Sequence, residues 1–303
     1  MSEPSLGDEF SSAPTAIQSK NGHGVHAPTS LDFLSGGGEM GALMRRFDWS
    51  STAMGLPEAW PQSLRSAISI CLESEFQIAV YWGSELSLIY NDQWKQIPGD
   101  KHPWALGRTA REVWPEIWET VGPLFSRVLA TGKATRSLDA LLAMHRRGFT
   151  EECYFDYTFS PIRDEAGGVG GVFNIVVETT FRVLEERRER LLRELREATA
   201  PARTGPQVCT LAVSALASDA ADLPFCLIYL SEETSGGQAL RLAAATGVAP
   251  NSPVGSSRPV SPLLVDLTAS SSAWPLAEAI SGKSTVIVEN LGERFPVSLP
   301  GGP

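Results

Sequence analysis

Cysteine is scarce in this 303-residue chain, and the cysteines that occur stand far apart. Cys71, Cys153, Cys209 and Cys226 show no Cys-x-x-Cys spacing, which zinc modules and dithiol redox sites commonly use. So few cysteines in a chain of this length also cannot form a disulfide framework. We therefore expect small buried thiols in a protein of a reducing compartment.

Long apolar runs and excess positive charge are also missing. No stretch reaches the roughly 20 apolar residues that a membrane-spanning helix needs, and the N-terminus lacks the basic and apolar regions of a signal peptide. The 25 Lys and Arg residues face 35 Asp and Glu, for a formal charge of -10. A negative chain repels phosphate backbones and anionic lipid. These features predict a soluble, cytoplasmic protein that binds neither nucleic acid nor membranes.

Residue sets for catalysis are absent as well. The sequence shows no Ser/His/Asp set, metal cluster or phosphate-binding loop, so an independent enzyme is the weakest hypothesis. His23 and His26 have ligand-like spacing, but they lie in a segment that would not preorganise a metal site. His102 precedes Pro103 in a polar loop, and we expect a surface residue there, with haem ligation as the alternative. No metal site is predicted.

The composition that is present divides the chain into four parts. Residues 1–29 have hardly any large apolar side chain and predict a disordered arm. Residues 30–180 predict a domain with N-terminal helices. Residues 181–200 predict a charged connecting helix, and residues 201–303 predict a second, incomplete module.

The first domain changes from helical to alternating periodicity. Apolar residues recur every three or four positions from Leu64 to Leu72, which predicts a helix. Helical character returns at 109–130. Five further segments predict strands, at 76–81, 86–90, 134–144, 149–159 and 169–177. We expect an α+β fold with a five-stranded antiparallel sheet and helices on one side.

The charged segment keeps a heptad-like seam of apolar residues. Leu184 and Leu191 are members of this seam, and Arg188 takes the place between them. A parallel dimeric coiled coil is slightly favoured over a single solvated helix, because one polar seam position weakens a coil without forbidding it.

The second module begins after a proline-rich break. Its pattern predicts helices at 208–216 and 274–280, strands at 225–230, 239–245 and 285–288, and a long Ser- and Pro-rich loop at 250–272.

Several strings in the first domain carry a family resemblance. They are LPEAWPQSLR at 56–65, YND at 90–92, KHPWALG at 101–107, VWPEIW at 113–118, SPIRD at 160–164 leading into GGVGGV at 167–172, and ETT at 178–180. With these strings, residues 56–182 resemble a PAS sensory domain, and more specifically the PAS modules at the front of multi-sensor hybrid histidine kinases. Glu178, Thr179 and Thr180 are a degenerate match to the triplet with which PAS domains often end.

The resemblance implies a function and partners. The string LPFCLIYL at 223–230 resembles a GAF domain, of which 201–303 would be the first two thirds. The implied protein is the sensory input region of a two-component histidine kinase, acting as a homodimer with a downstream kinase region or response regulator as partner. Its relay residues would be Glu178, Thr179, Thr180, Leu184, Arg188 and Leu191.

The kinase machinery itself is not recognisable in the sequence. No histidine is followed by Glu, as a phosphoacceptor histidine usually is, and no Asp-x-Gly-x-Gly pattern occurs. We therefore expect this chain to be non-catalytic and to supply the sensory part. A ligand-free PAS module that only mediates dimerisation is the alternative function.

The resemblance leaves the ligand open, because a PAS core holds a haem, a flavin, a small metabolite or nothing. Residues 107–112 resemble the light-sensing LOV subgroup, but Ala110 stands where the adduct-forming cysteine would be. Many aromatic residues predict either core packing or a pocket for a planar ligand. The candidate lining is Tyr81, Tyr90, Trp94, Phe125, Phe155 and Asn174, although an outward-facing Asn174 is the interpretation that we favour.

Overall fold

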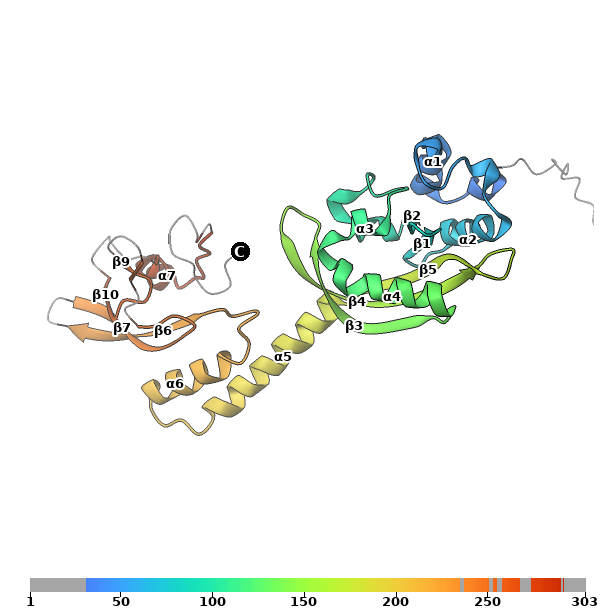
Figure 1. Cartoon of the computed structure of the whole chain (residues 1–303). Coiled ribbons are helices and arrows are strands. Elements are labelled where there is room, and N and C mark those ends of the chain that lie inside the picture. The colour runs from blue at the N-terminus through green and yellow to red at the C-terminus, as the bar shows by residue number, and fades with distance from the viewer. Residues whose placement is uncertain are drawn as a thin grey trace, which may run out of the picture. The chain divides into compact units, whose positions relative to one another are not determined.

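The computed structural model describes residues 31–234, 237–250, 253–254, 258–267, 274–289 and 291. The arm predicted for 1–29 lies outside these ranges. The chain divides into two compact units between Val177 and Glu178, which we describe separately (Figure 1). No helix in the described ranges is both long and apolar enough to cross a bilayer.

The first unit contains one five-stranded sheet with helices around it (Figure 1). Its elements are α1 (Gly38–Arg46), α2 (Gln62–Glu73), β1 (Ile78–Trp82), β2 (Ser87–Tyr90), α3 (Ala110–Val113), α4 (Trp118–Thr131), β3 (Thr135–His145), β4 (Thr150–Arg163) and β5 (Val169–Glu178). Short 3-10 helices lie between them, including η4 (Trp94–Gln96), η5 (Gly99–Lys101) and η6 (Pro115–Ile117). The strand order is β2-β1-β5-β4-β3. The predicted antiparallel sheet with flanking helices is confirmed.

Asn91 joins three elements at one end of this sheet. Its side chain is buried, and its amide nitrogen donates to the carbonyl oxygens of Cys71, Ser74 and Phe76 at 3.0, 3.0 and 2.7 Å. Its oxygen accepts from the backbone N–H groups of Ile78 and Trp94 at 3.1 and 3.0 Å. One side chain thus satisfies the end of α2, the start of β1 and the start of η4, as buried backbone groups require.

Strand β3 contains a bulge. The pairing with β4 shifts between Ser137 and Ala140, and Asp139 between them has a φ of 44°. The backbone N–H of Asp139 donates to Asp156 Oδ1 at 2.7 Å. Because a bulge adds one residue to one strand, the alternation of side chains changes parity after it. Leu142 and Met144 are therefore buried on the inner face.

Strand β4 shows the alternation that its sequence predicts. Its inward residues are nearly inaccessible, while the residues between them are partly exposed. They are Cys153, Phe155, Tyr157 and Phe159. This face and the helices enclose the core in which the candidate site lies.

The second unit has two helices before a small sheet. Its elements are α5 (Thr180–Thr199), α6 (Gly205–Leu216), β6 (Cys226–Thr234), β7 (Gly237–Thr246), β8 (Pro253–Val254), β9 (Arg258–Pro259), β10 (Leu264–Asp266) and α7 (Leu276–Gly282). The three-stranded sheet has the order β10-β7-β6, and β8 pairs with β9. The helices predicted at 208–216 and 274–280 correspond to α6 and α7, and the strands predicted at 225–230 and 239–245 correspond to β6 and β7.

Two predictions for this unit are wrong. Residues 285–288 have no regular secondary structure: their β-branched side chains favour a strand, but strand propensity is weak without a partner strand, and Ile287 is 81% exposed. Residues 250–272 are not only a loop, because they supply β8, β9 and β10. The run before Asp266 was too short to stand out, and its pairing with β7 is what makes it a strand.

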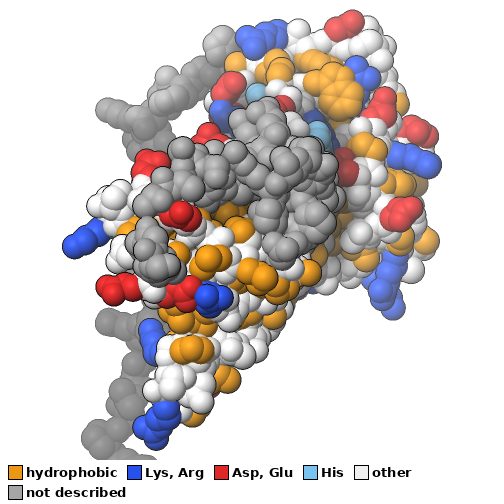
Figure 2. Space-filling view, turned by 90° about the vertical axis from the view of Figure 1, so that its left-hand side faces the viewer, with side chains coloured by type: hydrophobic (Ala, Val, Ile, Leu, Met, Phe, Trp, Pro, Cys, Tyr) orange, Lys and Arg blue, Asp and Glu red, His pale blue; other side chains and the backbone are white. Residues whose placement is uncertain are grey.

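Helix α5 packs against α6 and forms a charge cluster with the segment that follows α6. Leu191 is buried, as a predicted seam position. Arg187 forms an ion pair with Asp222 and lies 3.8 Å from Asp219. Arg188 Nε lies 3.4 Å from Asp222 Oδ2, although half of its side chain is exposed. The coiled coil of α5 stays a prediction. Figure 2 shows hydrophobic and charged side chains together on the face that is turned to the viewer.

Candidate functional site

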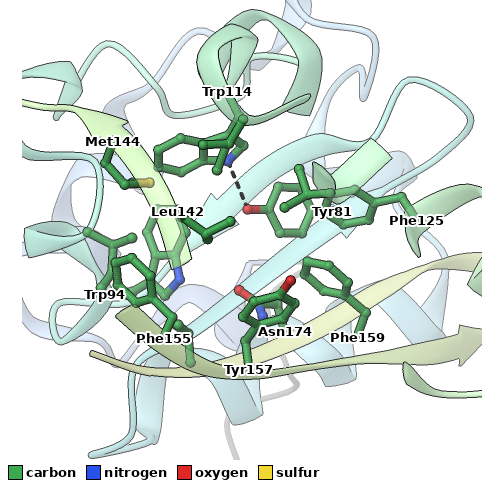
Figure 3. A pocket seen from close by; sticks show the side chains of 14 residues that line it. Tyr81, Trp94, Trp114, Phe125, Leu142, Met144, Phe155, Tyr157, Phe159 and Asn174 are labelled. Carbon is green, nitrogen blue, oxygen red and sulfur yellow. Dashed lines mark hydrogen bonds between the residues drawn. The ribbon is translucent and has the colours of Figure 1, made fainter. Parts of the chain in front are cut away.

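A buried pocket lies in the first unit, between the inner face of the sheet and the helical segments (Figure 3). Five of the six predicted residues line it: Tyr81, Trp94, Phe125, Phe155 and Asn174. They come from β1, η4, α4, β4 and β5 in that order. The fold thus brings together side chains that lie up to 93 positions apart in the sequence, from Tyr81 to Asn174 (174 − 81).

Tyr90, the sixth predicted residue, stands behind the lining. It is fully buried, and its ring centroid lies 4.9 Å from that of Trp94. Its hydroxyl group is 2.9 Å from Nδ1 of His102. Burial raises the pKa of Tyr90, so the phenol stays neutral. The side chain of His102 is only 21% exposed, which makes it less of a surface residue than the sequence predicts.

Asn174 corrects the favoured interpretation of that residue. It is 4% exposed and points to the inner face, not outward. Strand alternation explains this position, because Val172 and Val176 on either side of it are also buried. Asn174 Nδ2 donates to the carbonyl oxygens of Thr158 and Ile175, at 3.1 and 3.4 Å. A polar residue is tolerated here because these carbonyls satisfy its amide group.

Sequence reasoning missed most of the remaining lining. These residues are Ile97, Trp114, Ile117, Val121, Leu142, Met144, Tyr157, Phe159 and Val176. Tyr157 and Phe159 could have been found, since they share the period of two with Phe155 on β4. Leu142 and Met144 could not, because the bulge sets their facing.

The pocket presents few polar atoms. Trp114 Nε1 donates to the hydroxyl oxygen of Tyr81 at 3.1 Å, which leaves the Tyr81 O–H free to donate elsewhere. Burial raises the pKa of Tyr81, so this group is a neutral phenol. Trp94 Nε1 is buried and meets no acceptor in the described part of the chain. An unpartnered buried donor is uncommon, so this side of the pocket has a hydrogen-bond donor that a ligand could use.

Lys101 and Glu116 form contacts next to the pocket lining. Lys101 Nζ lies 4.9 Å from the centre of the Trp114 ring and 2.5 Å from Glu116 Oε1. The same carboxylate oxygen accepts from the backbone N–H of His145 at 3.2 Å. These contacts tie η5 and η6 to the end of β3.

The pocket is small in this conformation. Its free volume is about 40 Å³, where one water molecule needs roughly 10–15 Å³ by the same measure. It therefore has room for a few waters, and a haem or a flavin does not fit. Among the described residues that line it, none is a histidine or a cysteine, so neither a haem ligand nor a thiol for a flavin adduct is in place. Ala110, in α3, is buried and is not part of the lining.

The comparison with protein families decides what this unit is. Residues 79–184 match the family described as the PAS fold. These residues form a PAS domain. The match covers β1 to the first turn of α5 and includes every strand of the sheet except the start of β1. No curated protein matches the sequence.

Solved structures resemble parts of the chain at low identity. An RNA-binding light-oxygen-voltage receptor is 20% identical with a TM-score of 0.33, over 46% of this chain and 39% of that protein. A sensory box sensor histidine kinase from Vibrio cholerae is 14% identical with a TM-score of 0.28, over 38% and 89%. The LOV domain of a blue-light activated histidine kinase from Erythrobacter litoralis is 17% identical with a TM-score of 0.29, over 36% and 99%.

The predicted relay residues follow the PAS domain directly. Glu178 ends β5, and Thr180 begins α5 with its hydroxyl 2.9 Å from the Glu178 carboxylate. The carbonyl of Thr179 accepts from the N–H of Val183. Leu184 lies one turn further along α5. Whether these residues carry a signal stays a prediction.

Proposed function

We propose that the PAS domain senses a small molecule in its aromatic pocket and passes this state through α5 to an output region, as the sensory input of a histidine kinase. The observation that carries the proposal is the continuity of one strand with that helix. Asn174 and Val176 line the pocket from β5, β5 ends at Glu178, and α5 begins at Thr180. A ligand that moves β5 therefore acts on the first turn of α5 within a few residues.

A relay needs an element with two arrangements that both ends can bias. Helix α5 offers such an element, because Arg188 is shared between two uses. In this conformation it pairs with Glu185 and Asp222 of its own chain, while its position in the heptad-like seam would place it at the centre of a coiled coil. The two uses compete, and ligand binding would select between them.

Paired variants on β5 test the relay in the full chain. Asn174→Leu changes the pocket, whereas Ile175→Val changes a neighbouring residue that is 38% exposed. We expect Asn174→Leu to change amide hydrogen exchange of residues 180–190 at least severalfold, and Ile175→Val to leave it unchanged. Equal exchange in both variants and the parent would refute the relay. Arg188→Leu should change the dimer's stability and abolish the effect of Asn174→Leu.

The downstream partner follows from the same proposal. A kinase region or a response regulator is the output that we propose, and a GAF domain is our proposal for the fold to which 201–303 belong. A homodimer is the expected assembly, since a coiled coil of α5 needs a second copy.

A second candidate function is a ligand-free dimerisation module. The outer face of the sheet favours it, because Leu141, Ile175 and Val177 are exposed there by 54, 38 and 48%. Sedimentation of Leu141→Asp, together with ligand binding by the same variant, separates the two functions. A monomer that still responds to ligand supports sensing, whereas a monomer without any ligand response supports the ligand-free dimerisation module.

A further inference from the structure

The polar atoms of the pocket specify its ligand more closely, an inference that rests on the proposed function. We propose that the ligand is a small, uncharged, planar molecule of the carboxamide type, with an acceptor for Trp94 and a donor for Asn174. The argument uses charge, hydrogen bonding and size in turn.

Charge excludes ionised ligands. Among the described residues, the lining contains no Asp, Glu, Lys, Arg or His. Moving an ion from water into such a site costs several kcal/mol unless a counter-charge meets it. Tyr81 and Tyr157 offer only hydroxyl groups. The pocket therefore favours a neutral molecule over an acid or an amine of the same shape.

Trp94 requires a hydrogen-bond acceptor on the ligand. Its indole N–H is a donor only, and Nε1 is buried without an acceptor from the described residues. Trp94 itself is 1% exposed, and Figure 3 shows its nitrogen turned toward the interior of the lining side chains. A carbonyl oxygen on the ligand would satisfy this donor, whose desolvation is otherwise uncompensated.

Asn174 sets the donor. Its Nδ2 is directed at the carbonyls of Thr158 and Ile175, which fixes the orientation of the amide and leaves Oδ1 as the free acceptor. In the described part of the chain, no donor reaches Oδ1 within hydrogen-bond distance. An N–H group on the ligand would complete it. A ligand that satisfies both residues carries an acceptor for the Trp94 N–H and a donor for Asn174 Oδ1. A primary carboxamide provides both groups.

Shape and size limit the rest of the molecule. Phe125 and Phe159 stack with ring centroids 4.3 Å apart, and such flat walls favour a planar ligand. The free volume of about 40 Å³ is smaller than the ~150 Å³ cavity that admits a benzene ring elsewhere. A one-ring ligand therefore enters only when lining side chains move, and a larger ligand would need a larger rearrangement.

Three molecules of matched shape test the proposal on the full chain. Benzamide carries both groups, benzoate replaces the amide with a charge, and isopropylbenzene has neither polar atom. We expect benzamide to bind about tenfold or more tightly than either, by calorimetry or ligand-observed NMR. Acetophenone keeps the acceptor without the donor and should lie between. This ligand series needs no mutant and stands even if a variant fails to fold.

Trp94→Phe and Trp104→Phe are the matched variants. Trp94→Phe keeps the ring and removes the donor, so benzamide affinity should fall about tenfold while isopropylbenzene affinity stays unchanged. Trp104 is 48% exposed and outside the lining, so its variant should match the parent. An equal loss for both molecules in Trp94→Phe would assign that residue to packing and overturn the proposed acceptor.

The outcomes separate this inference from the proposed function. Benzoate binding as tightly as benzamide, or no binding of any of the four, overturns the ligand class, and the exchange of residues 180–190 then still decides the relay. Benzamide binding without a change in that exchange refutes the relay and leaves the ligand class supported.

Discussion

The two units bury their sheets in different ways. In the PAS domain the inner face of the sheet is covered along its whole length, and its core includes Trp94, Phe125 and Phe155 at 1% exposure. In the second unit the buried apolar residues are scattered, and Leu230, Leu263 and Leu264 remain exposed by 36, 52 and 48%. Among the described residues, the PAS domain is closed by apolar packing and by buried polar side chains. The second unit relies more on ion pairs between its helix and loop.

This difference teaches where each unit is vulnerable. The side chain of Asn91 forms five hydrogen bonds within the PAS domain, and removing it takes a partner from five backbone groups. The Arg187 cluster is partly exposed to solvent, so its loss should be milder. Three predictions follow, in order of expected effect.

The largest effect should come from Asn91→Leu. The side chain keeps its volume and loses five hydrogen bonds, two of which are to backbone groups of the buried residues Cys71 and Ile78. We expect the free energy of unfolding of the PAS domain to fall by about 3–5 kcal/mol, measured by urea unfolding with hydrogen exchange to assign each transition. The second unit should keep its midpoint. Equal shifts in both transitions would show that the units unfold together.

Asp222→Asn should have an intermediate effect, confined to the second unit. It removes the charge from the contacts of Arg187 and Arg188, and Arg187 is only 15% exposed there. We expect a loss of about 1–2 kcal/mol in unfolding free energy, read from the same unfolding curves. Arg188→Ala is the control, because that side chain is 55% exposed and should change stability by less than about 0.5 kcal/mol. A larger effect of Arg188→Ala would contradict the ranking.

The smallest effect is a pH dependence at the start of α3. Thr109 and Glu112 form a capping box, and hydrogen bonds from the backbone and side chain of Thr109 lower the pKa of Glu112. A lowered folded-state pKa contributes stability above the unfolded value of about 4.3 and loses it as the pH falls through the folded value. Glu112→Gln should therefore flatten the fall in PAS stability below about pH 4, by less than about 1 kcal/mol.

The control for this prediction is Glu119→Gln on α4. Glu119 is exposed and accepts no capping hydrogen bond, so the slope below pH 4 should match that of the parent. A parallel change in both variants would assign the effect to general charge.

Much of the PAS domain could be predicted from the sequence, because β4 alternates between buried and partly exposed residues, β1 and β2 are short apolar runs, and turn residues lie at the strand ends. The role of Asn91 depends on how distant segments pack, because its side-chain oxygen joins the start of β1 to the start of η4. Five lining residues of the pocket were predicted, because large aromatic side chains in an apolar pattern are usually buried in the domain core. Part of the remaining lining could not be predicted, because the bulge in β3 sets the direction of Leu142 and Met144.

The second unit could be predicted less well for a physical reason. Strands of two or three residues carry too little pattern to recognise, and only the pairing of Leu264 and Asp266 with β7 makes β10 a strand. Residues 285–288 have strand propensity and no partner. Tertiary context decides both cases.

The bulge in β3 affects how the pocket responds to changes in the length of the chain. Between Ser137 and Ala140 a single extra residue decides which side chains of β3 face the core. Leu142 lies opposite Cys153 on the side of the bulge that leads to the β3–β4 turn, so this pairing holds Leu142 and Met144 toward the core when one residue is inserted or deleted at the bulge. The bulge is therefore a place where the length of this strand can change without reversing that wall of the pocket.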